Sequence, residues 1–136
     1  MPIIQLEQNP DKLGSTVDEL NAHLPDSSPI SKFTFNACDT IEFVEALEAT
    51  KIEHWLICGI ESHICVYQTA RGLIEKGLNV EVVSDCVSSR TPDNKQLGLE
   101  RVRDSGGKIT GLEMCLYEMV QDCRKDEFKQ ILKLIR

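Results

Sequence analysis

The sequence predicts a single α/β domain built on a mostly parallel sheet. Apolar, strand-like runs alternate along the chain with helical segments of about 10–15 residues, the pattern of βαβ units. Of the 136 residues, 41% are hydrophobic, and only eight are Gly and five Pro. A chain of this length and composition can bury a core without a disulfide or metal. We therefore expect residues 1–136 to form one domain.

The individual elements follow from the spacing of apolar residues and from the turn residues at their ends. Strands are expected at Pro2–Leu6, Ile30–Asn36, His54–Ile60, Val80–Val83 and Lys108–Thr110. One helix is expected to begin after a cap at Asp39, with Ile41, Val44 and Leu47 on its apolar face. The other helices are expected at Thr16–Ala22, Ile64–Lys76, Asn94–Asp104, Leu112–Val120 and Asp126–Ile135. Turn residues predict a loop over Pro25–Pro29. The continuous apolar run His54–Ile60 predicts a strand covered on both faces.

Composition excludes several classes of partner. With 22 acidic and 15 basic residues the net charge is −7, so we expect neither nucleic acid nor an anionic membrane surface as a partner. The apolar runs are too short to span a bilayer. The chain opens on Met1-Pro-Ile-Ile, without the features of a targeting segment. These observations predict a cytoplasmic protein.

Six cysteines are widely spaced along the chain: Cys38, Cys58, Cys65, Cys86, Cys115 and Cys123. A disulfide framework is typical of small, loop-rich secreted domains, which this sequence does not resemble. There is also no CxxC pair or Cys/His cluster with zinc spacing. We interpret all six as reduced thiols and expect neither a metal nor a cofactor.

One segment carries the clearest chemistry. Residues Gly59–Cys65 run from the end of a buried strand through a tight turn into a helix. A cysteine in the first helical turn faces the positive end of the helix dipole, which favours the thiolate. Backbone N–H groups of such a turn lack helical partners and can face a substrate oxygen. A buried helix-entry cysteine without chemistry has the same spacing, so both interpretations remain open from spacing alone.

The residues Ile57–Ala70 and Val82–Arg90 resemble the isochorismatase-like hydrolases, in particular the isochorismatase domain-containing branch. The similarity continues in Glu7–Gly14 and Pro29–Lys32, so it covers nearly the whole chain in order. It implies a three-layer α/β/α, Rossmann-like fold. Because the cysteine is present, it also implies a cysteine hydrolase that acts on a small amide-like C–N substrate through a thioester.

The resemblance assigns roles to four residues. The family lysine matches Lys32 and the nucleophile matches Cys65. A cis peptide would join Ile60 and Glu61, and the backbone N–H groups of Glu61 and Cys65 would form the oxyanion hole. Members of the family commonly form homo-oligomers, and a homo-oligomer is expected here.

The family aspartate has no match in this sequence. It belongs to a first strand that precedes the one matching Ile3–Leu6, and this strand is central in the family sheet. A shorter gene product, a sheet that closes over the gap, or a strand donated by another chain would each account for the difference. Asp85, at the end of a neighbouring strand, is expected to hold its loop through Arg90 rather than to act as a base.

Three further side chains are candidates for the substrate pocket: Glu7, His63 and Arg90. His63 stands two residues before Cys65, where it cannot easily point back to the thiol, so we interpret it as a pocket or turn residue. The loop Gln8–Gly14 lacks the histidine of the metal cluster found in related nicotinamidases. Two alternatives to an active hydrolase stay open: a catalytically impaired member that acts as a non-catalytic interaction protein, and a redox sensor at Cys65.

Overall fold

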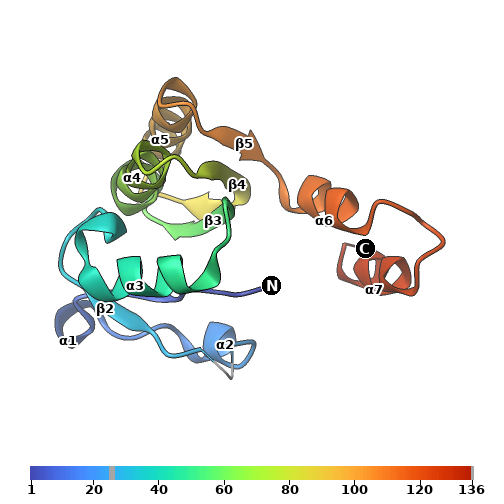
Figure 1. Ribbon diagram of the computed structural model, residues 1–136, viewed down its shortest axis with the longest axis horizontal. Helices are drawn as coiled ribbons and strands as arrows, with labels where there is room; N and C mark the ends of the chain where they lie inside the picture. Colours follow the sequence, from blue (N-terminus) through green and yellow to red (C-terminus); the bar gives the residue numbers. More distant parts are fainter. Residues whose placement is uncertain (25–26, 136) are drawn as a thin grey trace.

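A computed structural model of the chain describes residues 1–24 and 27–135. Pro25 and Asp26, which belong to the loop expected over Pro25–Pro29, lie outside the described residues. The molecule is an α/β structure of parallel strands with helices on both sides (Figure 1). The predicted fold class is confirmed.

The strands form two parallel sheets. β1 (Leu6–Gln8) pairs with β2 (Ile30–Lys32). β3 (His54–Ile60), β4 (Asn79–Ser88) and β5 (Lys108–Thr110) form the second sheet in the order β3-β4-β5. Within the described residues, β1 pairs only with β2 and β3 only with β4. Among the described strands each sheet is therefore open at both edges, at β1 and β2 in the first sheet and at β3 and β5 in the second.

Helices and helical turns connect the strands. They are α1 (Pro10–Leu13), α2 (Asp18–Asn21), the 3-10 turn η1 (Ala37–Asp39), α3 (Ile41–Thr50), the π-helical turn η2 (Ser62–Val66), α4 (Tyr67–Glu75), α5 (Pro92–Asp104), α6 (Leu112–Val120) and α7 (Asp126–Leu134). The core lies between α4, α5 and β4, where Leu73, Val82 and Val102 are fully buried. The α6–α7 pair lies beyond β5, at the far end of the molecule from α3 (Figure 1). None of the described helices is long and apolar enough to cross a membrane.

Three strands differ from their predicted bounds. The first begins at Leu6 instead of Pro2, because the ladder with β2 starts there, and Ile3 is left exposed. The second, expected to reach Asn36, ends at Lys32, where its ladder with β1 stops. The strand β4 was expected to end at Val83 but continues to Ser88. After an irregular stretch it pairs again with Gly59 and Ile60 of β3, through Val87 and Ser88. This pairing brings the end of β4 beside the turn that follows β3.

The prediction that β3 is covered on both faces is wrong. Alternate residues of a strand point to opposite faces. Trp55 and Ile57 pack against the core, whereas Leu56 is 38% and Ile60 72% exposed. Nothing within the described part of the chain covers this second face. A continuous apolar run therefore does not show how many layers surround a strand.

The apolar face of α3 also differs from the expected one. Phe43 and Leu47, four residues apart on one side of the helix, are its buried residues. Ile41, expected to face the core, is 73% exposed. The helix begins at Ile41, after Thr40 at the cap position, while Asp39 lies in the preceding 3-10 turn.

Candidate active site

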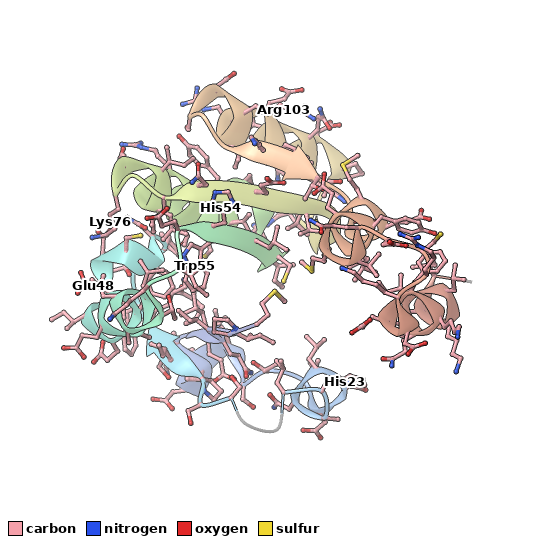
Figure 2. The ribbon with its side chains drawn as sticks, turned by 45° about the vertical axis from the view of Figure 1, so that its right-hand side comes forward. His23, Glu48, His54, Trp55, Lys76 and Arg103 are labelled. Carbon is pink, nitrogen blue, oxygen red and sulfur yellow. The ribbon has the colours of Figure 1, made fainter. Side chains whose placement is uncertain are left out.

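The site lies at the carboxyl ends of β1, β2 and β3. The residues labelled near β3 in Figure 2 lie away from this edge: His54 and Trp55 start β3, Glu48 lies on α3, and Lys76 follows the end of α4. At the carboxyl ends, the register of the first sheet places Gln8 beside Lys32. The turn η2, which carries Cys65, follows β3. This is the edge at which ligands bind in open parallel sheets.

Lys32 is a buried cation held by neutral groups. The whole residue is only 4% exposed. The ammonium Nζ donates to Gln8 Oε1 at 2.5 Å, to the Thr34 carbonyl at 3.0 Å and to the Phe35 carbonyl at 3.5 Å. None of the ion pairs formed by the described residues includes Lys32. Burying a charge without a counter-ion is costly, so this ammonium favours any negative charge that forms next to it.

Cys65 meets the same acceptor. It is half-buried in the π-helical turn, and its Sγ donates to Gln8 Oε1 at 3.9 Å. The two residues expected to act together, Lys32 and Cys65, are therefore joined through one oxygen atom of Gln8. The sequence patterns predict Glu7 as a pocket candidate and do not indicate Gln8. The alternation of side chains along β1, together with the pairing of Gln8 with Lys32, is the signal that identifies it.

Glu7 lies outside this group. Its carboxylate accepts a hydrogen bond from the backbone N–H of Thr16 at 2.7 Å. This bond lowers the pKa of Glu7 below its usual value. Glu7 pairs with Ser31 in the ladder, one position away from Gln8, so its side chain leaves the strand on the other face. We assign it to the loop before α2 rather than to the site.

The turn before Cys65 begins with a cis peptide bond between Ile60 and Glu61, where the resemblance places one. The carbonyl of Glu61 then accepts hydrogen bonds from the N–H groups of Ile64 at 3.1 Å and Val66 at 3.2 Å. The second of these spans five residues, which is the spacing of a π-helix. The helix expected from Ile64 thus starts as a π-helical turn, and the α-helical part begins at Tyr67.

A polar network braces this turn from the end of β4. Arg90 Nε lies 3.2 Å from Glu61 Oε1, and His63 Nε2 lies 3.6 Å from Glu61 Oε2. His63 Nδ1 lies 3.1 Å from Ser89 Oγ, which also accepts from the N–H of Ser62 at 3.0 Å. His63 and Arg90 are therefore in one cluster with Glu61. Ser89, which sequence analysis did not single out, connects the turn to β4.

The expected pairing of Asp85 with Arg90 is not found. Arg90 pairs with Glu61, and the Oδ1 of Asp85 instead accepts from the N–H of Leu112 at 2.8 Å. Leu112 is the first residue of α6. A carboxylate at a helix start is favoured by the helix dipole and by the unpaired N–H groups there. Asp85 therefore holds α6 and not the loop before α5.

A shallow hollow of about 320 Å³ adjoins this network. It lies between α4 and α5, with the guanidinium of Arg101 5.8 Å from the centre of the Tyr67 ring. Its lining residues are His63, Tyr67, Leu97, Gly98 and Arg101. Of the pocket candidates only His63 reaches it, and neither Cys65 nor Lys32 does. The hollow is therefore a neighbour of the site and not its substrate cavity.

The cysteines and histidines do not assemble a metal site in residues 1–24 and 27–135, where no group of three His, Cys, Asp or Glu side chains is placed to hold an ion. All six cysteines are free thiols. The chemistry that the described residues offer is that of a half-buried thiol, a buried ammonium and the backbone N–H groups of a helical turn.

Comparison with known proteins decides the family. Residues 1–114 match the Isochorismatase domain. The chain belongs to the isochorismatase family. It is 39% identical to the secreted isochorismatase effector Isc1 of Phytophthora sojae, over all of this chain and 67% of that protein. It is 35% identical to isochorismatase domain-containing protein 2A of Mus musculus, over all of this chain and 65% of that protein. The isochorismatase chain thus spans about two thirds of the length of these relatives.

Solved structures of isochorismatase-like proteins superpose closely on this one. The structure of MAR1 ribonuclease from Caenorhabditis elegans has a TM-score of 0.91 at 34% identity, covering 99% of this chain and 69% of that chain. YcaC from Pseudomonas aeruginosa, with hexane-2,5-diol and covalent acrylamide, has a TM-score of 0.89 at 27% identity, covering 95% and 66%. The Escherichia coli YcaC gene product, described as an octameric hydrolase of unknown specificity, has a TM-score of 0.87 at 27% identity, covering 93% and 63%.

Proposed function

We propose that this isochorismatase-family protein hydrolyses a small amide-like C–N substrate with Cys65 as the nucleophile. The observation that supports this is the meeting of Cys65 Sγ and Lys32 Nζ at one oxygen of Gln8. Thiolates, not thiols, are the attacking species. A buried ammonium that binds the same oxygen as the sulfur supplies positive charge that favours a thiolate.

The proposed reaction has two steps. The Cys65 thiolate attacks the substrate carbonyl carbon, the carbonyl oxygen becomes an oxyanion, and the N–H groups of Glu61 and Cys65 donate to it. The intermediate then collapses to a thioester as the C–N bond breaks, and the amine leaves with a proton. Water attacks the thioester carbonyl, releases the carboxylic acid and restores the thiol.

The expected turnover rate depends on the two proton transfers of this reaction. The amine must receive a proton, and the attacking water must lose one. Within the described residues, no carboxylate shares a hydrogen bond or an ion pair with Lys32 or Cys65. The Asp85 carboxylate instead accepts a hydrogen bond from the backbone N–H of Leu112. Loss of one member of a cooperating catalytic set can cost about 10⁴-fold in rate, so we expect slow turnover by residues 1–136 alone.

Acrylamide provides a direct test. The related Pseudomonas protein contains covalent acrylamide, and acrylamide adds to thiolates by forming an S–C bond while the neighbouring carbon takes up a proton. We expect acrylamide to label Cys65 faster than the exposed Cys58, measured by peptide mass spectrometry. Cys65→Ser should abolish both this labelling and any release of ammonia from small amides, and Cys58→Ser should change neither. Equal labelling of both cysteines in the unaltered protein would contradict the proposal.

We also propose a cytoplasmic homo-oligomer acting on a small molecule. The octameric description of the Escherichia coli relative supports self-association. So do the apolar side chains of Met114 and Met119 on α6, which are 59% and 51% exposed. Light scattering on a sizing column should give a mass above 15.3 kDa. Replacing both methionines by Glu should lower it, whereas Leu13→Glu, at a 72% exposed position on α1, should not.

RNA hydrolysis is not part of the proposal, although the Caenorhabditis relative is named a ribonuclease. The net charge of this chain is −7. Proteins that bind RNA without sequence preference use positively charged surfaces to hold the phosphates. The described site has one buried cation. It therefore suits a small substrate, uncharged or with a single anionic group, better than a polyanion such as RNA.

A further inference from the structure

The side-chain amide of Gln8 has three polar neighbours. Its Oε1 accepts from Lys32 Nζ at 2.5 Å and from Cys65 Sγ at 3.9 Å. Its Nε2 donates to the Phe33 carbonyl at 2.9 Å. Gln8 is the last residue of β1, and the residue opposite it in the ladder is Lys32. The strand pair therefore holds the amide beside the ammonium.

The orientation of this amide is determined by its neighbours. An ammonium can only donate hydrogen bonds, and a carbonyl can only accept them. Turning the amide by 180° would place its NH₂ group against Lys32 Nζ and its oxygen against the Phe33 carbonyl. Both bonds would be lost and replaced by repulsion. The oxygen therefore faces Lys32 and Cys65, and Cys65 can interact with it only as a donor.

We propose that Gln8 is a positioning residue, which holds the ammonium of Lys32 at the sulfur of Cys65 and so sets the reactivity of that sulfur. The inference rests on the proposed function of Cys65 and Lys32. The other two acceptors of Lys32, the carbonyls of Thr34 and Phe35, follow it along the chain. Without Gln8 they alone direct the ammonium, and the contact that links it to the sulfur is lost.

The sign of the effect follows from the charges. The oxygen of Gln8 carries only part of a dipole and disfavours a thiolate weakly, whereas the ammonium carries a full charge and favours it. Removing Gln8 therefore reduces the reactivity of Cys65 through the displaced Lys32. The effect is larger for an anionic reagent, which the ammonium also attracts, than for a neutral one.

The experiment compares alkylation of Cys65 by neutral iodoacetamide and anionic iodoacetate in the full chain between pH 6 and 9, with exposed Cys58 as internal standard. Gln8→Met keeps the length of the side chain and removes its polar atoms. We expect Gln8→Met to slow the alkylation of Cys65 about fivefold, an effect of the size found for residues coupled within one hydrogen-bond network. The reaction with iodoacetate should slow more than the reaction with iodoacetamide. Gln96→Met, at an exposed position on α5, is the matched control and should change neither rate.

A double-mutant cycle with Lys32→Met tests whether Gln8 acts through Lys32. Gln8→Met should have no further effect once Lys32 is replaced. An equal effect in both backgrounds, or no effect in either while Lys32→Met slows Cys65, overturns the role of Gln8 and leaves the proposed function intact. If Cys65 is alkylated no faster than Cys58, and Lys32→Met does not change the rate at Cys65, the proposed function itself fails.

Folding of the variants is checked by thermal melting and by the rate of Cys58. Should Gln8→Met fail to fold, Gln8→Glu keeps an oxygen on Lys32. In that variant Lys32→Met should still slow Cys65. A Cys65 rate that no longer depends on Lys32 in the Gln8→Glu background would likewise overturn the inference.

Discussion

Gly98 of α5 packs directly against Ser62 in the turn that carries Cys65: a Cβ at Gly98 would lie 2.6 Å from the carbonyl oxygen of Ser62 and 2.7 Å from the N atom of His63. These are backbone atoms and cannot move aside as a flexible side chain can. Ser62 is itself buried at 1% exposure. Only glycine permits this close approach of the helix to the turn.

Gly98→Ala is therefore expected to push η2 away from α5. Overpacking of this kind costs about 1–3 kcal/mol in the free energy of unfolding, although alanine is by itself the better helix former. Thermal melting should show the loss, and alkylation of Cys65 should change with it. Gln96→Ala, at an exposed position on the same helix, should stabilise the protein slightly or leave it unchanged. A Gly98→Ala protein as stable as the original would show that η2 can shift freely.

Ser89 is expected to matter more for the turn than Arg90. The Ser89 hydroxyl accepts from the N–H of Ser62 and contacts His63, so Ser89→Ala leaves a backbone donor of buried Ser62 without that partner. The cost is about 1–3 kcal/mol in the free energy of unfolding. Arg90 is 68% exposed in its pair with Glu61, and such a pair contributes about 1 kcal/mol or less. Urea denaturation of Ser89→Ala and Arg90→Gln should give this order, and the reverse order would contradict the described network.

The lowered pKa of Glu7 predicts that the free energy of unfolding depends on pH. The N–H of Thr16 lowers the pKa of Glu7 in the folded chain. A lowered folded pKa adds stability that is present above the unfolded pKa of about 4.3 and is lost as the pH falls through the folded pKa. Glu7→Gln should therefore be less stable than the original protein at pH 7, and the difference should shrink below about pH 4.

Urea denaturation from pH 2.5 to 7 measures this difference for Glu7→Gln. Glu48→Gln, which removes an exposed carboxylate on α3 (Figure 2), is the matched control. A stability difference for Glu7→Gln that is constant over the whole range would mean that the carboxylate charge does not contribute.

The thiols themselves are expected to react at different rates. Burial, as the largest cause, raises the pKa of Cys38 and of Cys86, and the charge of Asp85 adds to the effect at Cys86. A raised pKa leaves less thiolate at pH 8. Both should be alkylated more slowly than exposed Cys58 and Cys123, and their rates should keep rising with pH above 9. Time-resolved peptide mass spectrometry gives the rate at each cysteine, and equal rates at pH 8 would contradict this order.

The local sequence determined the elements whose signals lie within a few neighbouring residues. The strand His54–Ile60 and the helix Leu112–Val120 have the bounds that their apolar patterns predict. Parallel pairing also follows, because strands separated by helices must return in the same direction. The family resemblance identified Lys32 and Cys65, whose proximity no local pattern shows.

Tertiary structure alone decided which side chains meet. Gln8 and Cys65 are 57 positions apart and share a contact because the carboxyl ends of β1 and β3 lie on one side of the molecule. The exposed face of β3, the approach of Gly98 to Ser62 and the pairing of Arg90 with Glu61 depend in the same way on distant segments. A periodic pattern reports only on which residues are apolar. Which neighbour covers them, and which polar atoms meet, depends on the packing of elements far apart in the chain.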